Sequence, residues 1–312
     1  GMSGKKLIIQ IPCLNEAKTL PTTLRDLPRS IEGIEAIEVL IIDDGSTDNT
    51  VDIAKQLGVN HIIHHTTNQG LAKAFMTGIT ECLARGADII VNTDADNQYK
   101  GEDIKELVRP IINGEAEIVV GARPISDIKH FSPAKKALQK IGSLTVRIAS
   151  NTDIEDAPSG FRAFSRFAAR QINVFSEYTY TLETIIQAGQ KNIPIKSVAI
   201  RTNADLRPSR LVKSIPAYIR RSIITMVRIF IVYRPFRFFT YLALFFFSAG
   251  SILLLRYLLL YISGDGSGHI QSIILGSICI IFSSQLLLLG FIADLQSVNR
   301  KILEDVRAKL LK

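Results

Sequence analysis

The sequence predicts an α/β protein with a doubly wound, mostly parallel sheet, followed by an amphipathic helix and two membrane-spanning helices. Over the first two thirds of the 312 residues, short apolar runs alternate with stretches of helical length, a pattern typical of parallel sheets. Several of these runs end in carboxylates. The last third holds two long apolar segments, and each reaches the ~20 residues that a helix needs to cross a bilayer.

Short apolar segments that are followed by a turn or a polar loop are expected to be strands. They are residues 5–12, 38–44, 61–63, 89–92, 117–120 and 195–200. Helices are expected between them, most clearly at residues 70–85, 102–112, 133–150, 165–171 and 180–188. The sequence has no Gly-x-Gly-x-x-Gly motif after the first strand and no Walker A loop, which disfavours an ordinary dinucleotide fold and a P-loop nucleotidase.

The predicted strand at residues 89–92 leads into two carboxylates and an amide at alternate positions, Asp94, Asp96 and Gln98. Alternate residues of an extended segment point to the same side, so these three can present oxygens to one hard cation. The alternative is an acidic turn that caps the next helix. Carboxylates also follow the first two strands, at Glu16, Asp43 and Asp44. Several carboxylates at one sheet edge repel each other unless a cation is present, so we expect a bound metal.

Basic residues gather in two places beyond Arg123. The first group lies at residues 129–147 and includes Lys135, and it indicates either a rim that attracts phosphate or a solvated helix face. The second group consists of Arg201, Arg207 and Arg210, together with Ser209. Because the segments near the predicted membrane account for the net charge of +8, we expect no nucleic-acid partner.

The C-terminal third is expected to anchor the chain in a lipid bilayer. Residues 211–234 place apolar side chains on one helix face with basic residues between them, which is typical of a helix lying on an anionic membrane surface; the alternative is an ordinary core helix. Residues 235–293 are expected to form two spans, and residues 294–312 a basic tail. Since the short loop between the spans has no Lys or Arg, the positive-inside rule places both ends of the hairpin in the cytoplasm.

Six motifs occur in a fixed order along residues 6–210. They are Pro12-Cys13-Leu14-Asn15-Glu16, Asp43-Asp44-Gly45-Ser46-Thr47-Asp48, Asn68-Gln69-Gly70, Asp94-Ala95-Asp96-Asn97-Gln98, Gly121-Ala122-Arg123 and Asp156-Ala157-Pro158-Ser159-Gly160-Phe161-Arg162. This set resembles the family 2 glycosyltransferases of the GT-A fold, and in particular the dolichol-phosphate mannosyltransferases and bacterial polyprenyl-phosphate glucosyltransferases. The two-span hairpin resembles that of the bactoprenol glucosyltransferases.

The resemblance implies a role for each matching residue. Pro12, Asn15, Glu16, Asp43, Asp44 and Asp94 would bind the nucleotide sugar, and Asp94, Asp96 and Gln98 would hold Mg²⁺ or Mn²⁺ on its diphosphate. Asp156 stands at the position of the catalytic base, with Arg123 and Arg162 facing phosphate. Arg123, Lys135, Arg207, Ser209 and Arg210 would contact a lipid phosphate.

The implied reaction is inverting transfer of a hexose from a nucleotide sugar to polyprenyl phosphate at the cytoplasmic face of a bacterial-type plasma membrane. UDP-glucose is the first donor expected and GDP-mannose the alternative. A processive polysaccharide synthase would be expected to carry a Gln-x-x-Arg-Trp motif, and this chain has no Trp. The alternative from a different functional class is a non-catalytic membrane scaffold with a transferase-like head.

The expected organisation follows from these assignments. Residues 1–210 would form the cytosolic catalytic domain, before the amphipathic helix, the hairpin and the tail. Small residues of the second span offer contact points for a homo-oligomer, namely Gly276, Ser277, Ser283, Ser284 and Gly290.

Overall fold

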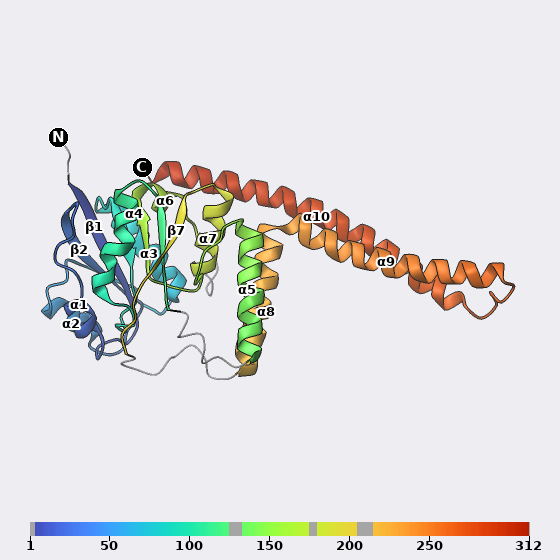
Figure 1. Cartoon of the computed structure of the whole chain (residues 1–312), viewed down its shortest axis with the longest axis horizontal. Coiled ribbons are helices and arrows are strands. Elements are labelled where there is room, and N and C mark those ends of the chain that lie inside the picture. The colour runs from blue at the N-terminus through green and yellow to red at the C-terminus, as the bar shows by residue number, and fades with distance from the viewer. Residues whose placement is uncertain (1–3, 125–132, 175–179, 205–214, 312) are drawn as a thin grey trace. The chain divides into compact units, whose positions relative to one another are not determined.

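The computed structural model describes residues 4–124, 133–174, 180–204 and 215–311 (Figure 1). Seven strands form one sheet in the order β3-β2-β1-β4-β6-β5-β7. Their bounds are β1 Lys5–Cys13, β2 Ile34–Asp43, β3 His61–His64, β4 Ile89–Asn92, β5 Ile118–Ala122, β6 Arg162–Ser165 and β7 Ile195–Ala199. Every neighbouring pair is parallel except for the two pairs that β6 makes, so the predicted mostly parallel sheet is confirmed.

Helices cover both faces of the sheet (Figure 1). Their bounds are α1 Leu20–Arg25, α2 Thr50–Gln56, α3 Leu71–Ala84, α4 Ile104–Ile112, α5 Pro133–Ser150, α6 Arg166–Gln171 and α7 Tyr180–Gln190, with a 3₁₀ turn at Gly101–Asp103. Apolar residues of α1, α2 and α4 share one buried cluster with the sheet, and those of α3, α6 and α7 share the other. The two layers of helices shield the strands from water on both sides, as parallel sheets require.

The central strand β1 shows why the sequence forms this sheet. Leu7, Ile9 and Ile11 enter the cluster on one face, and Ile8 enters the cluster on the other. Successive side chains of a strand point to opposite faces, so a continuous apolar run suits a strand that is covered twice. These four residues have no exposed surface, and β1 therefore lies at the centre of the domain.

The antiparallel strand β6 is the main departure from the predicted topology. The sequence predicts only a short Phe-rich segment after the loop that contains Asp156, whereas the structure inserts this segment between β4 and β5. Ala163 pairs with Val91 on one side and with Val119 on the other. The insertion places the loop that precedes Arg162 next to the carboxyl end of β4.

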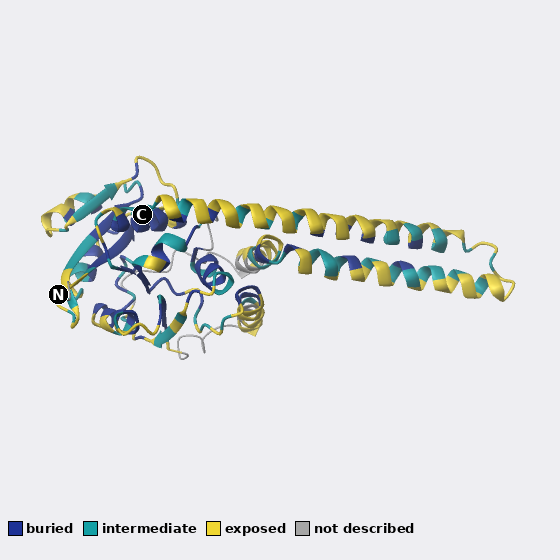
Figure 2. Ribbon diagram, turned by 90° about the horizontal axis from the view of Figure 1, so that it is seen from above, coloured by how far each residue is buried: buried dark blue, intermediate teal, exposed yellow. Residues whose placement is uncertain are grey.

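Residues 224–306 form a second compact unit. It contains most of α8 (Ile215–Tyr233), α9 (Pro235–Ile262) and most of α10 (Ile270–Leu310). Both α9 and α10 are long and apolar enough to cross a membrane, and Figure 2 shows that most of their surface is exposed. Helix α10 continues to Leu310 and so includes most of residues 294–312, which were expected to form a basic tail.

Within this unit, small residues let α9 and α10 approach closely. A Cβ atom on Gly250 would lie 2.7 Å from the carbonyl oxygen of Gly276, and the Ser283 hydroxyl donates a 2.7 Å hydrogen bond to the carbonyl of Ala243. Gly276 and Ser283 were expected to serve contacts between subunits, but they serve contacts inside the hairpin. Oligomerisation stays a prediction.

Candidate active site

The carboxyl ends of β1, β2 and β4 lie side by side, which brings the polar residues after them to one edge of the sheet. Cys13 at the end of β1 is paired with Asp43 at the end of β2, and Gln10 of β1 with Asn92 at the end of β4. Open α/β sheets bind their ligands outside this edge. Pro12 is buried within β1 one residue before the edge.

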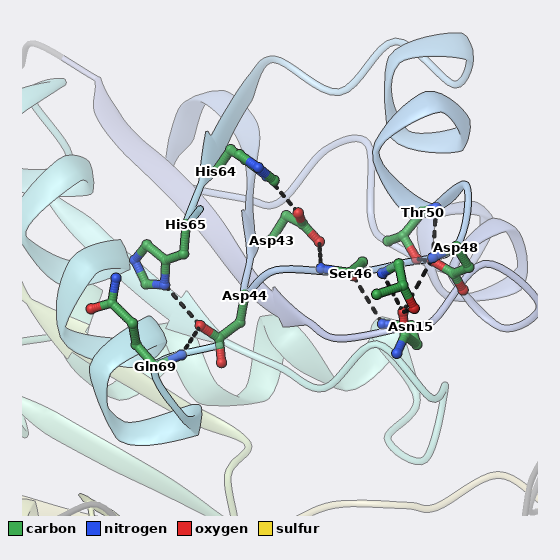
Figure 3. A network of polar contacts seen from close by, with 10 residues as sticks. Asn15, Asp43, Asp44, Ser46, Asp48, Thr50, His64, His65 and Gln69 are labelled. Carbon is green, nitrogen blue, oxygen red and sulfur yellow. Dashed lines mark hydrogen bonds and ion pairs between the residues drawn. The ribbon is translucent and has the colours of Figure 1, made fainter. Parts of the chain in front are cut away.

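Asp44 organises the loop before α3 (Figure 3). Its carboxylate accepts hydrogen bonds from the backbone amides of Gln69 and Gly70, each 2.9 Å long, and lies 2.9 Å from Nδ1 of His65. Nε2 of His65 is 3.0 Å from the hydroxyl of Thr77 on α3. A nucleotide that reached Asp44 would therefore share this carboxylate with the start of α3.

Asp43 is completely buried beneath a histidine. Oδ2 of Asp43 lies 2.6 Å from Nδ1 of His64, and Oδ1 accepts a 3.2 Å hydrogen bond from the amide of Ser46. The side chain of His64 is 54% exposed. Figure 3 shows the imidazole directed at Asp43. The imidazole is thus the part of this pair that solvent, or a ligand, can reach.

Asn15 and Glu16 fasten the loop after β1 to the loop after β2. The side-chain oxygen of Asn15 accepts hydrogen bonds from the amides of Thr47 (2.8 Å) and Asp48 (3.3 Å). Asn15 adopts a left-handed backbone conformation, with a φ of 54°, which asparagine tolerates better than most residues. The amide of Glu16 donates to the hydroxyl of Thr50, and its own carboxylate is buried.

The loop after β4 carries the predicted metal ligands and is not the extended segment that the sequence suggested. Asn97 has a φ of 58°, and the amide of Gln98 donates back to the carboxylate of Asp96 at 3.2 Å. The alternation is nevertheless kept, since Asp94, Asp96 and Gln98 are partly exposed while the residues between them are buried. The three predicted ligands therefore remain open to solvent on one loop.

These three side chains fit a hard divalent cation but do not complete its coordination. Two carboxylates and one amide are oxygen donors of the kind that Mg²⁺ and Mn²⁺ prefer, and Mg²⁺ usually takes its remaining ligands from water and substrate phosphates. Among the described residues, no group of three or more His, Cys, Asp and Glu side chains is arranged to hold a metal. The loop thus suits a cation that arrives with an anionic ligand.

Two buried tyrosines lie beside Asp94. Burial first, and then the negative charge of Asp94, raise the pKa of Tyr99 and of Tyr180, so both hydroxyls stay protonated at neutral pH. A Cβ atom on Gly160 would lie 2.9 Å from the hydroxyl of Tyr180 and 3.4 Å from Oδ1 of Asp94. Only glycine leaves room for this approach of the loop that precedes β6.

Asp156 is held by Arg123 in a two-pronged ion pair. Nε and one terminal nitrogen of Arg123 donate to the two carboxylate oxygens at 2.7 and 2.8 Å, and the Arg123 amide donates to Oδ2 at 2.9 Å. The hydrogen bonds from Arg123 to Asp156 raise the pKa of Arg123 further above its ordinary value. A carboxylate fixed in this way is well placed to orient Arg123.

The expectation that Arg162 faces a phosphate is not met in this structure. The side chain has no exposed surface, and its guanidinium donates to the carbonyls of Ala157, Ser159 and Thr181 and to the hydroxyl of Thr184. Burial lowers the pKa of Arg162 to about 10, which still leaves it charged at neutral pH. Arg162 therefore ties the loop before β6 to α7.

Four predicted phosphate contacts cannot be placed. Arg207, Ser209 and Arg210 lie outside the described residues, and so does the side chain of Lys135 on α5. The sequence reading also missed His64, His65, Tyr99, Tyr180 and Asn203. The two histidines at the end of β3 offered the clearest signal, because they follow an apolar strand at the same edge as the carboxylates.

Comparisons with known proteins agree with this architecture. Residues 8–172, a little over half of the chain, match the family model for glycosyl transferase family 2. The chain is 32% identical over 226 residues to a UDP-N-acetylglucosamine–dolichyl-phosphate N-acetylglucosaminyltransferase of Methanococcus voltae, covering 64% of this chain and 87% of that protein. It is 30% identical over 175 residues to an undecaprenyl-phosphate mannosyltransferase of Micrococcus luteus, covering 54% and 70%.

A solved structure shows the same fold. Glucosyl-3-phosphoglycerate synthase of Mycobacterium tuberculosis, in complex with Mn²⁺, UDP-glucose and phosphoglyceric acid, superposes with a TM-score of 0.57. The match covers 72% of this chain and 80% of that chain at 19% identity. The predicted GT-A fold is therefore confirmed.

The burial of Arg162 predicts a structural defect when it is replaced. Arg162→Lys retains a positive charge but cannot reach four acceptors, and each buried carbonyl left without a donor costs about 1–3 kcal/mol. We expect the free energy of unfolding, measured by urea denaturation, to fall by at least about 2 kcal/mol. Arg109→Lys, at an exposed position of α4, is the control. An Arg162→Lys protein with unchanged stability but no activity would instead indicate direct contact with substrate.

The ion pair between Arg201 and Asp103 predicts a pH-dependent contribution to stability. Burial raises the pKa of Asp103 and hydrogen bonds from Arg201 lower it, with a net shift downward. The ion pair therefore contributes fully to stability at pH values above the ordinary aspartate pKa of ~3.9. This contribution is lost as the pH falls through the lowered pKa of Asp103. In thermal unfolding we expect Arg201→Gln to lower the melting temperature at pH 7 and to approach that of the unaltered protein as the pH falls through the lowered pKa of Asp103. A difference independent of pH would contradict this account.

Proposed function

Because this chain belongs to glycosyl transferase family 2, we propose that it transfers a hexose from a nucleotide sugar to a polyprenyl phosphate. The observation that carries the proposal is the presence, in one chain, of an oxygen-donor loop at the sheet edge and of two helices able to cross a membrane. The names of several relatives specify transfer of mannose, glucose or N-acetylglucosamine to dolichyl or undecaprenyl phosphate. UDP-glucose is the first donor proposed, and GDP-mannose the second.

The loop after β4 would receive the diphosphate of the donor. Asp94, Asp96 and Gln98 would hold Mg²⁺ or Mn²⁺, and the Mn²⁺ and Mg²⁺ complexes of a structural neighbour support a divalent ion in this fold. Bound there, the cation would neutralise the negative charge that develops on the leaving diphosphate. The loops fastened by Asn15 and Asp44 would form the wall for the nucleoside.

Asp156 would act on the acceptor through Arg123. A phosphate monoester has a second pKa near ~6, so at neutral pH the acceptor is largely deprotonated and needs little help from a base. The ion pair with Asp156 instead holds Arg123 in a fixed orientation at the end of β5. Asp156 would thus position a cation for an anionic acceptor.

The membrane arrangement follows from the charges of the chain. The loop between α9 and α10 has no Lys or Arg, whereas residues 294–312 are basic. We propose that the catalytic domain and both termini lie in the cytoplasm, where nucleotide sugars are made. A non-catalytic scaffold with a transferase-like head remains the alternative of a different class, and it would bind neither metal nor nucleotide.

Transfer can be tested with a panel of radiolabelled nucleotide sugars and a short polyprenyl phosphate in detergent. We expect label from one donor to enter the lipid phase and EDTA to stop the transfer, because the diphosphate needs a cation. Asp96→Asn should lower the rate by at least ~100-fold if it removes a metal ligand. Binding of metal and nucleotide without a lipid product would point to another acceptor, and absence of both would favour the scaffold.

The role of Asp156 predicts a modest kinetic effect. Losing a general base typically costs 10²- to 10⁴-fold in rate, whereas losing an orienting partner mainly weakens binding. We expect Asp156→Asn to raise the KM for polyprenyl phosphate and to lower kcat by less than about 10-fold. The measurement is steady-state kinetics at pH 7.5, with Asp153→Asn as the exposed control. A fall in kcat of more than ~100-fold at unchanged KM would restore Asp156 as the base.

A further inference from the structure

One residue on the segment after β7 binds three consecutive carbonyl groups of the loop that carries the predicted metal ligands. The backbone amide of Asn203 donates to the carbonyl of Gln98 at 2.8 Å. Its side-chain Nδ2 donates to the carbonyl of Asn97 at 3.0 Å and to that of Tyr99 at 3.4 Å. Asn203 lies more than 100 residues from this loop in sequence, so it is the tertiary fold that brings them together.

The neighbours of Asn203 continue the attachment along the loop. Thr202 forms an antiparallel bridge with Tyr99, and the amide of Lys100 donates to the carbonyl of Arg201 at 3.3 Å. Arg201 also pairs with Asp103 just beyond the loop. Residues 201–203 therefore act as a short strand that supports the backbone of residues 97–100.

The backbone contacts matter here because the side chains proposed to bind the cation are partly exposed to solvent. Asp94, Asp96 and Gln98 are partly exposed, and Asn97 has a left-handed backbone conformation that turns the chain. The orientation of the side chain of Gln98 depends on the peptide groups on either side of it. The carbonyls on both sides of that residue accept hydrogen bonds from Nδ2 of Asn203, and its own carbonyl accepts one from the amide of Asn203.

We infer that Asn203 is a positioning residue that sets the geometry of Asp96 and Gln98 for a divalent cation on a nucleoside diphosphate. This inference rests on the proposed function of the loop. A side-chain amide suits the task, because its nitrogen carries two hydrogens that can be given to two acceptors. An aspartate of the same shape would turn an oxygen toward the carbonyls and would add negative charge near Asp96.

The test uses the full chain in detergent and compares Asn203→Ala, Asn203→Asp and Asn203→Gln with Asn60→Ala. Asn60 is a matched control, because its side chain also hydrogen-bonds a backbone group, the amide of Val39, but at the amino end of β3. Binding of Mn²⁺ is measured in the presence of UDP and, separately, GDP, by calorimetry and by the electron paramagnetic resonance signal of free Mn²⁺. Melting temperature and transfer rate as a function of Mn²⁺ concentration are recorded for each protein.

Loss of groups that orient metal ligands typically costs 10- to 100-fold in metal affinity. We expect Asn203→Ala and Asn203→Asp to weaken Mn²⁺ binding by at least about 10-fold, with a rate near that of the unaltered protein once Mn²⁺ is saturating. Asn203→Gln keeps both side-chain amide hydrogens and should recover part of the Mn²⁺ affinity. Asn60→Ala should change neither the Mn²⁺ affinity nor the transfer rate.

Unchanged Mn²⁺ affinity in Asn203→Ala and Asn203→Asp would overturn the inference. A second outcome would also overturn it. If excess Mn²⁺ did not restore the transfer rate of the Asn203 variants, and their melting temperature fell well below that of Asn60→Ala, the role of Asn203 would be structural only. If the unaltered protein binds Mn²⁺ with neither UDP nor GDP and transfers no sugar, the proposed function fails, and the inference fails with it.

Discussion

Repulsion between the carboxylates at one edge of the parallel sheet is the constraint on which this domain depends. The parallel strands place their carboxyl ends together, and the chain puts aspartates there or in the loops that follow. Asp43 lies against His64, Asp44 accepts from two amides beside His65, and Asp156 is paired with Arg123. Each of these carboxylates is more than nine-tenths buried and has donors from another part of the chain, whereas Asp94 and Asp96 keep part of their surface exposed. The buried carboxylates organise loops, and the partly exposed ones are accessible to a ligand.

A second group of buried polar residues keeps the loop before β6 close to this edge. The side-chain nitrogen of Asn92 donates to the carbonyl of Gly160, while its oxygen accepts from Gln10 on β1. Arg162 holds the same loop from the other side, through three carbonyls and a hydroxyl. Buried polar groups are costly unless they are hydrogen-bonded, so a fully paired set specifies one loop conformation. The position of Gly160 beside Asp94 and Tyr180 follows from these contacts.

The sequence was sufficient for features that depend on local pattern and insufficient for features that depend on distant partners. Alternating apolar runs predicted the parallel strands, because burial on both faces leaves a direct mark in composition. The antiparallel direction of β6 left no such mark, since four residues of mixed character fit a strand of either direction. Arg162 was expected at a phosphate because the family resemblance implies that role, and only the fold reveals its buried acceptors. The role of Asn203 depends on contacts with residues more than 100 positions away, which no local pattern records.

Because Arg162 is buried, other residues must supply the positive charge that an anionic acceptor needs. Arg162 is enclosed, whereas the side chains of Arg123 and Arg201 are 29% and 56% exposed. Each of these two is paired with an aspartate, Asp156 and Asp103, which offsets some of its charge. A lipid phosphate placed beside the diphosphate of the donor would bring two anions together, and arginines that are already paired with aspartates supply little net charge for that task. The prediction that Arg207, Ser209 and Arg210 contact the acceptor therefore gains importance, although these residues lie outside the described ranges. They follow Asn203 within seven positions, so the segment that supports the donor loop leads directly into the residues proposed to meet the acceptor.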